Sequence, residues 1–485
     1  MFLVIIVIII IIRLDKCHTF GNKKSKTASE QYEPMILLYR ERIPTITKSE
    51  SFIYLGTQFN FENDIENIKK DLADSIVSYV TTIDQLPLSP LNKVSIINYY
   101  VYSKFRWRFS IYNLTETWIS QNIDNLIYKY IRKWFQLPIS ANVSHLSLPL
   151  KKLGLSFKSA KDLYRQCKLT VRKILKMSVN PEIRRLYHIT SNNNIPSDYI
   201  VNKIIQTNSQ QSQKQITSKM NRSFEEANNE NVWKNFMNLK EQNKIISHIL
   251  SACTPKVINM WQSLAKNLPP NIFCFARKSL VFCLPNKSNL LRWKLADSNL
   301  CSWCSKMETQ LHVFSNCVNS LNRYTWRHDS ILNTILHKLL RSPKNITKLY
   351  ADCGKLQFPC PSDLFRSKRP DIVIRIEKRL IVLELTVCFE TNTKKSRIYK
   401  EDRYKMLKDD LLVECEVFDI FFVEFTTLGF ISTDSLQPFS KLLFELEINA
   451  DRLLYKCMET AIRATYFIFC RRNRPWIDTE LLNFY

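Results

Sequence analysis

The sequence predicts a multidomain protein with a largely helical first half, a short cysteine-rich segment and an α/β module at the end. Its 485 residues exceed what a single core usually holds. Up to about residue 200, apolar residues recur at three- and four-residue steps, which is typical of amphipathic helices. From residue 371, the strand-like runs "DIVIRI" and "RLIVLELTVCF" are flanked by helices, which indicates a compact α/β module.

The net charge indicates a polyanionic partner. The chain has 70 Lys and Arg against 44 Asp and Glu, a formal charge of +26 at pH 7, and solubility alone needs much less. Because Trp and Tyr are interleaved with the basic residues, nucleic acid is favoured over a membrane surface. Only five glycines occur, which excludes the glycine-rich phosphate loops of P-loop and Rossmann enzymes.

The distribution of cysteines and the first residues of the chain give indications of its cellular compartment. Fourteen cysteines are spread irregularly over the chain, which favours reduced thiols and an intracellular compartment. Residues 2–12, "FLVIIVIIIII", match a signal-peptide apolar region in length, but no basic stretch precedes them and no small-residue cleavage site follows. They are shorter than the ~20 residues that span a bilayer. A secreted or anchored protein is the alternative, and it rests on this run alone.

The elements before residue 301 are expected to be mostly helical. Residues 36–61 are the exception, because "FIYLGTQFNF" is typical of a strand and a turn around Gly56. Apolar side chains then recur at helical spacing at Leu72, Ile76, Tyr79, Val80, Val94, Ile97, Val101 and Phe105. Residues 205–230 are polar and nearly free of large apolar side chains, which predicts a linker at a domain boundary.

One expected helix, ended by Pro138, is a candidate nucleic-acid contact. In its sequence, "NLIYKYIRKWFQLP", three basic residues are interleaved with three aromatic residues. The basic residues are Lys129, Arg132 and Lys133, and the aromatic residues are Tyr128, Tyr130 and Trp134. Aromatic rings with basic side chains between them can bind the backbone of a nucleic acid. An amphipathic core helix with a solvated basic face explains the pattern equally well.

Residues 301–317, "CSWCSKMETQLHVFSNC", predict a zinc knuckle. Its candidate ligands have the spacing Cys-x2-Cys-x7-His-x4-Cys and are Cys301, Cys304, His312 and Cys317. Three thiolates and one imidazole suit tetrahedral zinc, and four protein ligands leave no open position for a substrate, so the ion would be structural. The alternative is a cluster of ordinary buried cysteines. Cys353 and Cys360 have no matching ligand pair and are expected to be core or free thiols.

The segment "KRPDIVIRIEKRLIVLELTV" predicts a pair of acidic side chains. If its two strands join through a two-residue turn at Glu377 and Lys378, Asp371 faces Glu384, with their Cβ atoms ~5 Å apart. Two carboxylates this close repel each other unless a cation bridges them, and Mg²⁺ prefers such oxygen ligands. Alternatively, the hairpin lies on the surface, where Asp371 caps a turn and Glu384 pairs with a lysine.

A metal-dependent phosphodiesterase also needs a lysine to hold the attacking water and the developing charge. The position two residues after Glu384 is Thr386. Lys400, in "IYKEDRY" at the start of the following helix, is therefore the candidate. Lys394 and Lys395 are nearer in sequence and remain alternatives.

Seven motifs, taken in order, resemble one protein family. They are "YLG", "LPLKKLGLSF", "LPNKSNLLRW", "ETQLHVFSNC", "RYTWRHDSIL", "RPDIVI...LELTV" and "KEDRY". This order resembles the C-terminal half of the protein encoded by site-specific non-LTR retrotransposons with a restriction-enzyme-like endonuclease, and it covers nearly the whole chain. The resemblance implies a PD-(D/E)xK-type nuclease in which Asp371 and Glu384 bind Mg²⁺, Lys400 is the catalytic lysine and Tyr404 lies near the site.

The family also has a motif that matches Arg327, His328 and Asp329, close to the nuclease fold. The resemblance implies that these residues orient the site, brace the knuckle or contact nucleic acid.

The resemblance implies a domain order as well. The expected parts are a reverse-transcriptase palm remnant with an apolar start (1–60), an α-helical thumb-like region (61–204), a polar linker (205–230), a helical linker region (231–300), the zinc knuckle with its following helix (301–345) and an α/β restriction-endonuclease-like domain (346–485). No Tyr/Phe-Ala-Asp-Asp motif occurs, and Asp409 and Asp410 fall far downstream of where a polymerase pair belongs. We therefore expect a truncated protein that does not polymerise DNA by itself.

The expected function is nicking of one DNA strand for target-primed reverse transcription, in the nucleus. DNA is the expected target and the element's RNA a further partner, with neither a small-molecule substrate nor a membrane involved. The alternative is a zinc-containing nucleic-acid-binding protein whose nuclease is catalytically dead.

Overall fold

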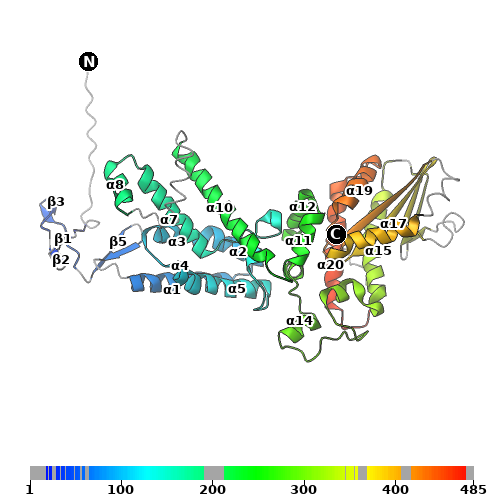
Figure 1. Cartoon of the computed structure of the whole chain (residues 1–485), viewed down its shortest axis with the longest axis horizontal. Coiled ribbons are helices and arrows are strands. Elements are labelled where there is room, and N and C mark those ends of the chain that lie inside the picture. The colour runs from blue at the N-terminus through cyan, green and yellow to red at the C-terminus, as the bar shows by residue number, and fades with distance from the viewer. Residues whose placement is uncertain are drawn as a thin grey trace, which may run out of the picture.

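The computed structural model describes residues 18–19, 21–24, 29–32, 34–38, 40–47, 50–54, 57–60, 65–190, 212–344, 346–353, 356–358, 369–405 and 417–476. The apolar run 2–12, Gly56, Cys360 and the pair Asp409 and Asp410 lie outside these residues. The described chain is mostly helical, with a small mixed sheet. It is elongated, with the first strand pairs and the first helices towards one end of the long axis and the five-stranded sheet with its helices towards the other (Figure 1).

The first described segments are short antiparallel strand pairs. They are β1 (Gly21–Lys24) with β2 (Ser29–Tyr32), β3 (Leu37–Leu38) with β4 (Glu41–Arg42), and β5 (Ser51–Tyr54) with β6 (Thr57–Asn60). The extended chain predicted for residues 51–60 is therefore confirmed in the described strands.

The first helical region follows directly. It comprises α1 (Ile65–Gln85), α2 (Pro90–Ile96), a π-helical turn (Ile97–Val101), α3 (Tyr102–Ile111), α4 (Glu116–Ile119), a second π-helical turn (Ser120–Asp124), α5 (Asn125–Phe135), α6 (Ser144–Ser147), α7 (Ala160–Met177) and α8 (Pro181–Thr190). The helical spacing predicted from the sequence is confirmed, because Leu72, Ile76 and Val80 of α1 are all 0% exposed. Burial of such a stripe is what stabilises a surface helix.

The segment predicted as a polar linker is helical in its described part. α10 (Gln213–Met237) begins with a capping box in which Ser212 and Gln215 satisfy each other's backbone N–H groups. Ile216 and Met220, four residues apart, are buried, whereas most other α10 side chains are exposed or half-buried. Ile216, Met220 and the fully buried Phe236 therefore anchor this helix, which a capping box begins, although much of its composition is that of a linker. Residues 205–211 lie outside the described residues.

The following helices connect the first helical region to the sheet. They are α11 (Lys244–Ala252), α12 (Pro255–Asn267), α13 (Pro270–Leu280), α14 (Lys287–Arg292) and α15 (Leu321–Leu339). The indole of Trp261 in α12 stacks on Phe430 at 4.9 Å and donates to the Leu428 carbonyl at 2.8 Å. On the other side, the fully buried Arg277 of α13 donates to the Leu153 carbonyl at 2.7 Å. These contacts join both ends of the molecule to one hydrophobic core.

The sheet near the C-terminus has the strand order β11-β10-β9-β7-β8 within the described residues. Its strands are β7 (Lys348–Cys353), β8 (Leu356–Phe358), β9 (Ile372–Ile376), β10 (Arg379–Cys388) and β11 (Val417–Thr426). β10 pairs in parallel with β11, and the other pairs are antiparallel. The described part of this region also contains the helices α17 (Thr393–Tyr404), α19 (Thr433–Glu445) and α20 (Ala450–Cys470).

The interior strand β10 is covered on both faces. Leu380 and Val382 pack with Tyr404 of α17 in one small cluster, while Ile381 and Leu383 belong to the main core. Side chains alternate between the faces of a strand, so Glu384 points to the α17 face. Within the described ranges, every helix is too short or too polar to cross a lipid bilayer.

His145 in α6 makes the fold sensitive to acid. Its side chain is fully buried, Nδ1 lies 2.7 Å from the Asn142 carbonyl, and Nε2 has no hydrogen-bond partner among the described residues. Burial and the nearby charge of Arg277 lower the pKa of His145 to about 3. The folded protein therefore keeps this imidazole neutral at pH values where an unfolded chain protonates it.

We predict that the free energy of unfolding falls as the pH is lowered from ~6.5 towards 3, with His145 contributing up to about 1.4 kcal/mol per pH unit. The stability is present above the unfolded-state pKa and is lost below it, because only the unfolded chain takes up the proton. Denaturant unfolding at several pH values should show a shallower pH slope for His145→Phe. His188→Phe, at an exposed position, should keep the wild-type slope, and equal slopes for all three proteins would contradict the prediction.

Candidate functional site

The predicted knuckle residues converge. The ligand atoms of Cys301, Cys304, His312 and Cys317 all lie within 4.8 Å of one another. The Cys317 sulfur lies 3.9 Å from that of Cys301 and 3.7 Å from that of Cys304, and Cys304 Sγ lies 3.3 Å from His312 Nε2. A tetrahedral zinc ion with Zn–S bonds of ~2.3 Å requires sulfur atoms about 3.8 Å apart. The cluster is therefore suited to a metal ion such as zinc.

Local hydrogen bonds shape the knuckle. The Cys301 amide donates to the Lys306 carbonyl at 2.7 Å and closes the first loop. The Tyr324 hydroxyl of α15 accepts from the Cys317 amide at 3.1 Å and donates to the His312 carbonyl at 3.0 Å. Burial lowers the pKa of His312, which favours the neutral imidazole that binds metals.

The knuckle is fastened to two helices outside it. The carboxylate of Glu308 accepts from the Lys287 amide of α14 at 3.0 Å and pairs with Arg472, just after α20, at 3.2 Å. Arg323 of α15 donates to the carbonyls of Arg471 and Arg474. These contacts surround the cluster with protein, as in a structural metal site.

The second candidate centre is built on the predicted hairpin. β9 and β10 pair antiparallel with Arg379 opposite Ile376 and Leu383 opposite Ile372. The turn at Glu377 and Lys378 is therefore confirmed. Its tightness is reflected in the φ of Glu377, which is 49°.

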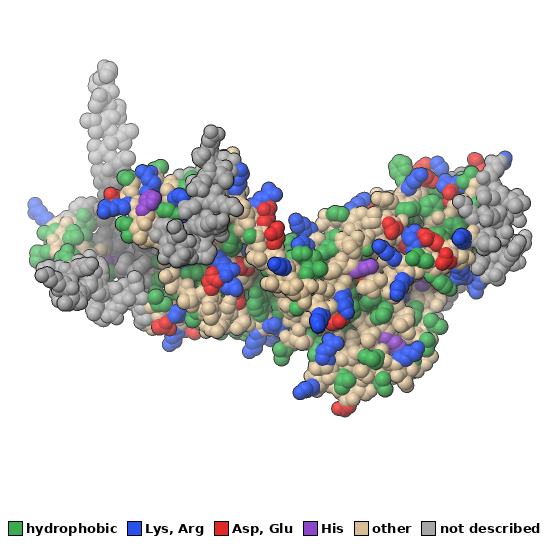
Figure 2. Space-filling model, viewed as in Figure 1, with side chains coloured by type: hydrophobic (Ala, Val, Ile, Leu, Met, Phe, Trp, Pro, Cys, Tyr) green, Lys and Arg blue, Asp and Glu red, His purple; other side chains and the backbone are tan. Residues whose placement is uncertain are grey.

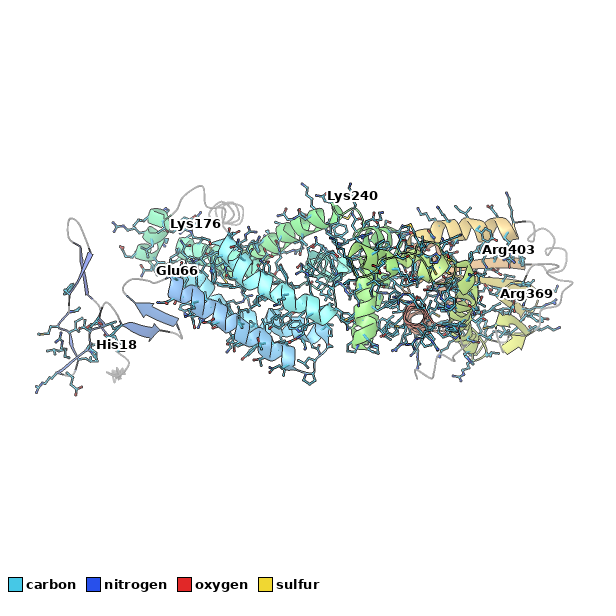
Figure 3. The ribbon with its side chains drawn as sticks, turned by 90° about the horizontal axis from the view of Figure 1, so that it is seen from below. His18, Glu66, Lys176, Lys240, Arg369 and Arg403 are labelled. Carbon is cyan, nitrogen blue, oxygen red and sulfur yellow. The ribbon has the colours of Figure 1, made fainter. Side chains whose placement is uncertain are left out.

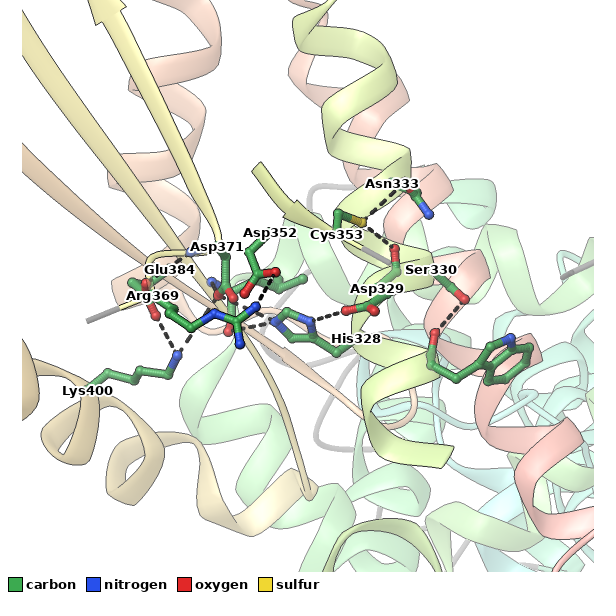
Figure 4. Close-up of polar contacts among 12 residues, drawn as sticks. His328, Asp329, Ser330, Asn333, Asp352, Cys353, Arg369, Asp371, Glu384 and Lys400 are labelled. Carbon is green, nitrogen blue, oxygen red and sulfur yellow. Dashed lines mark hydrogen bonds and ion pairs between the residues drawn. The ribbon is translucent and has the colours of Figure 1, made fainter. Parts of the chain in front are cut away.

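The two predicted carboxylates meet at the open end of this hairpin. The Asp371 amide donates to Glu384 Oε1 at 3.2 Å, and the Leu385 amide donates to Asp371 Oδ2 at 2.8 Å. Lys400 Nζ lies 2.5 Å from Glu384 Oε2 and 3.9 Å from Asp371 Oδ2 (Figure 4). Tyr404, one helical turn further along α17, donates to Glu384 Oε1 at 2.6 Å. The four residues predicted for this centre therefore lie together.

The pKa values of Glu384 and Asp371 are shifted in opposite directions. Burial and the neighbouring Asp371 charge raise the pKa of Glu384, although Lys400 and Tyr404 oppose this. Burial alone would raise the pKa of Asp371 too, but His328 and Lys400 outweigh it and lower that pKa. Burial and Glu384 raise the pKa of Tyr404 far above its usual value, so Tyr404 remains a hydrogen-bond donor.

His328 of α15 completes the centre. Its Nε2 lies 3.4 Å from Asp371 Oδ2 and 3.2 Å from the Leu385 carbonyl, and its Nδ1 lies 3.0 Å from Asp329 Oδ1. Burial would lower the pKa of His328, but the two aspartates raise it to about 10. The predicted role in orienting the site fits this position. The sequence alone did not indicate a direct contact between His328 and Asp371.

The alternatives for the lysine lie elsewhere on α17. Lys394 and Lys395 are exposed in its first turn, whereas Lys400 is half-buried. Asp352 of β7 donates its amide to the Asp371 carbonyl at 3.0 Å and pairs with Arg369 at 2.9 Å. Arg369 lies at the sheet end of the molecule, near Arg403 and far from His18 (Figure 3).

Arg327 does not have the surface position that a contact with nucleic acid requires. It is 1% exposed, and its guanidinium donates to Thr465 Oγ1 of α20 at 3.2 Å. Desolvation by burial lowers the pKa of Arg327 to about 10. Its position fits the alternative role of bracing α15, which follows the knuckle.

The basic helix α5 is in large part a core helix. Trp134 is buried and donates to Asp84 at 2.9 Å, and the same carboxylate pairs with Lys133 at 2.6 Å. Lys129 is exposed and Arg132 half-buried. Lysine and arginine side chains are spread over both ends of the visible face rather than gathered on α5 (Figure 2). The buried position of Trp134 therefore does not support the prediction that this ring contacts nucleic acid.

Comparison with known proteins adds one distant relative. No protein-family model matches the chain. Over 326 residues, 66% of the chain, the sequence is 20% identical to the retrovirus-related Pol polyprotein from type-2 retrotransposable element R2DM of Drosophila melanogaster. The match spans 29% of the length of that polyprotein. This distant similarity supports a retrotransposon-derived protein.

We predict that protein purified without added metal carries about one equivalent of zinc per chain, because a closed site with this donor set holds its ion tightly. Elemental analysis measures this directly. Cys304→Ser should lose the metal and lower the melting temperature, whereas Cys470→Ser, at an exposed thiol, should keep both. A zinc content far below one equivalent in wild-type protein would rule out the metal site.

Proposed function

We propose that this retrotransposon-derived chain is a metal-dependent DNA endonuclease that nicks one strand of its target. The observation that carries the proposal is the convergence of Asp371, Glu384 and Lys400 at one end of the β9–β10 hairpin. Two acids and a lysine in one half-buried site are what phosphodiester hydrolysis requires. The similarity to a Pol polyprotein supports a nucleic-acid substrate.

Asp371 and Glu384 are the residues that would hold Mg²⁺. Their carboxylates are hard oxygen donors, 14% and 0% exposed, on adjacent strands. Burial and the Asp371 charge raise the pKa of Glu384, whereas His328 and Lys400 lower the pKa of Asp371. Mg²⁺ in such a site supplies polarisation of the phosphate and a lower pKa for the attacking water.

The remaining residues have distinct roles in this proposal. The Lys400 ammonium is within reach of both acids and would hold the water and the charge that develops on the phosphate. Tyr404 fixes the orientation of Glu384, and His328 fixes that of Asp371. The lysine comes from α17 rather than from the position of Thr386, because α17 lies over the β10 face that carries Glu384.

The knuckle would hold zinc in a structural role. In this proposal the knuckle and the nuclease centre belong to one retrotransposon-derived protein. The nick would prime reverse transcription, so the element's RNA is a further proposed partner and the nucleus the proposed location. A catalytically dead nucleic-acid-binding protein is the second candidate, and the charge of +26 supports it equally.

We predict that the protein nicks supercoiled plasmid in the presence of Mg²⁺ and that Asp371→Ala abolishes nicking. Lys400→Met should slow nicking by at least about 100-fold, because one charge-stabilising group is commonly worth this much. Lys394→Met, on the same helix, is the matched control and should nick at the wild-type rate. Gel analysis of nicked and supercoiled plasmid measures all four proteins.

Nicking that persists in Asp371→Ala would assign it to another site or to a contaminant. Binding of the plasmid by every variant without any nicking would support the second candidate instead.

A further inference from the structure

The helix formed by α2, the π-helical turn Ile97–Val101 and α3 presents aromatic side chains to solvent. Tyr99 is 82% exposed, Tyr100 52% and Trp107 41%. The buried side of the same helix already contains Tyr102, Phe105 and Phe109. The exposed rings are therefore additional to those that the core uses.

The exposed residues form two rows on one helix face. Tyr100, Lys104 and Trp107 follow the i, i+4, i+7 spacing, and Tyr99, Ser103 and Arg106 follow it one residue earlier. Residues so spaced lie side by side on a helix. Lys104, Arg106 and Ser103 are also exposed. We call Tyr99, Tyr100, Lys104, Arg106 and Trp107 the α3 face.

Contacts at its base hold the α3 face in place. The Tyr100 ring meets Tyr79 of α1 edge-on at 6.2 Å, and Lys104 Nζ lies 5.4 Å from the centre of the same ring. Arg108 of α3 forms an ion pair with Asp71 of α1 at 2.8 Å, which also joins the two helices. The π-helical turn includes both tyrosines, and such turns are rare and often lie at functional sites.

We propose that the α3 face binds single-stranded nucleic acid, with bases stacked on Tyr99, Tyr100 and Trp107 and phosphates held by Lys104 and Arg106. Aromatic rings stack on unpaired nucleobases of any sequence, and basic side chains beside the rings attract the phosphate backbone. From Tyr100 to Trp107 the helix rises about 10 Å, about the length of three bases stacked 3.4 Å apart. A chain of charge +26 complements this polyanion.

A duplex does not fit this face, because its bases are paired and stacked on each other and offer no free surface to the rings. RNA and DNA single strands share the chemistry that is needed. The α3 face belongs to the first helical region, whereas the proposed nuclease residues lie on the sheet and α17 (Figure 1). Binding here is therefore independent of whether the nuclease is active.

The test compares the full-length protein with Tyr99→Leu/Tyr100→Leu/Trp107→Leu, which keeps apolar bulk and removes the rings. Fluorescence anisotropy would use labelled 20-nucleotide DNA and RNA strands of one sequence and the matching DNA duplex, in buffer without Mg²⁺. We expect at least about a 10-fold loss of affinity for the single strands and less than about a twofold change for the duplex. Loss for only one of the two strands identifies RNA or DNA as the ligand.

Two controls make the result specific to stacking. Tyr99→Phe/Tyr100→Phe/Trp107→Phe keeps three rings and should bind single strands within about threefold of wild type. Phe444→Leu removes another exposed ring, 83% accessible on α19, and should bind as wild type does. Because the leucine variant also loses the ring contact between Tyr100 and Tyr79, its melting temperature should fall slightly, so binding is measured well below that temperature.

Three results would overturn the proposal. Single-strand affinity that is unchanged in the leucine variant excludes stacking on this face, as does an equal loss for strands and duplex. A leucine variant that binds nucleic acid normally but changes its oligomeric state would assign the α3 face to contact between copies of the chain. None of these results depends on nicking, so the proposed nuclease stands or falls separately.

Discussion

The burial of one carboxylate constrains the whole sheet end of the molecule. Glu384 lies in the interior strand β10 with its side chain 0% exposed, and an uncompensated charge at such a position costs several kcal/mol. Compensation comes from three directions: the Lys400 ammonium and the Tyr404 hydroxyl of α17, and the Asp371 amide at the end of β9. The hairpin register and the placement of α17 are therefore linked through a single acidic side chain.

α15 connects this centre to the knuckle. Its first turn follows the last knuckle cysteine, Tyr324 holds the knuckle backbone, and His328 reaches Asp371 one turn later. Buried Arg327 fixes the same helix to α20 through Thr465. A metal ion in the knuckle would thus stabilise the end of the helix that positions Asp371. This explains what a small metal site contributes in the middle of a large protein.

Local patterns in the sequence predicted the parts of the structure that depend on spacing. Apolar stripes such as Leu72, Ile76 and Val80 specified helices, and the turn at Glu377 and Lys378 specified the pairing of Asp371 with Glu384. The four knuckle residues are close in sequence, so their convergence was predictable as well.

The failures concern burial, which depends on tertiary partners that no local pattern shows. Arg327, for which contact with nucleic acid was one predicted role, is buried and donates to Thr465. Trp134 is buried and donates to Asp84, in agreement with the core-helix alternative. The helix α10, which includes the described part of the polar segment 205–230, depends on a cap and on burial of Ile216, Met220 and Phe236 that composition does not reveal.

The central claim is that the two acids and the lysine at the hairpin end form a cation site. Its most direct test is a crystal structure of the protein with a DNA oligonucleotide and Mn²⁺, a substitute for Mg²⁺ that gives an anomalous signal. The account predicts one anomalous peak in contact with carboxylate oxygens of both Asp371 and Glu384, with Lys400 beside it. An absence of density there, with Lys400 still paired to Glu384 and the DNA bound elsewhere, would contradict it.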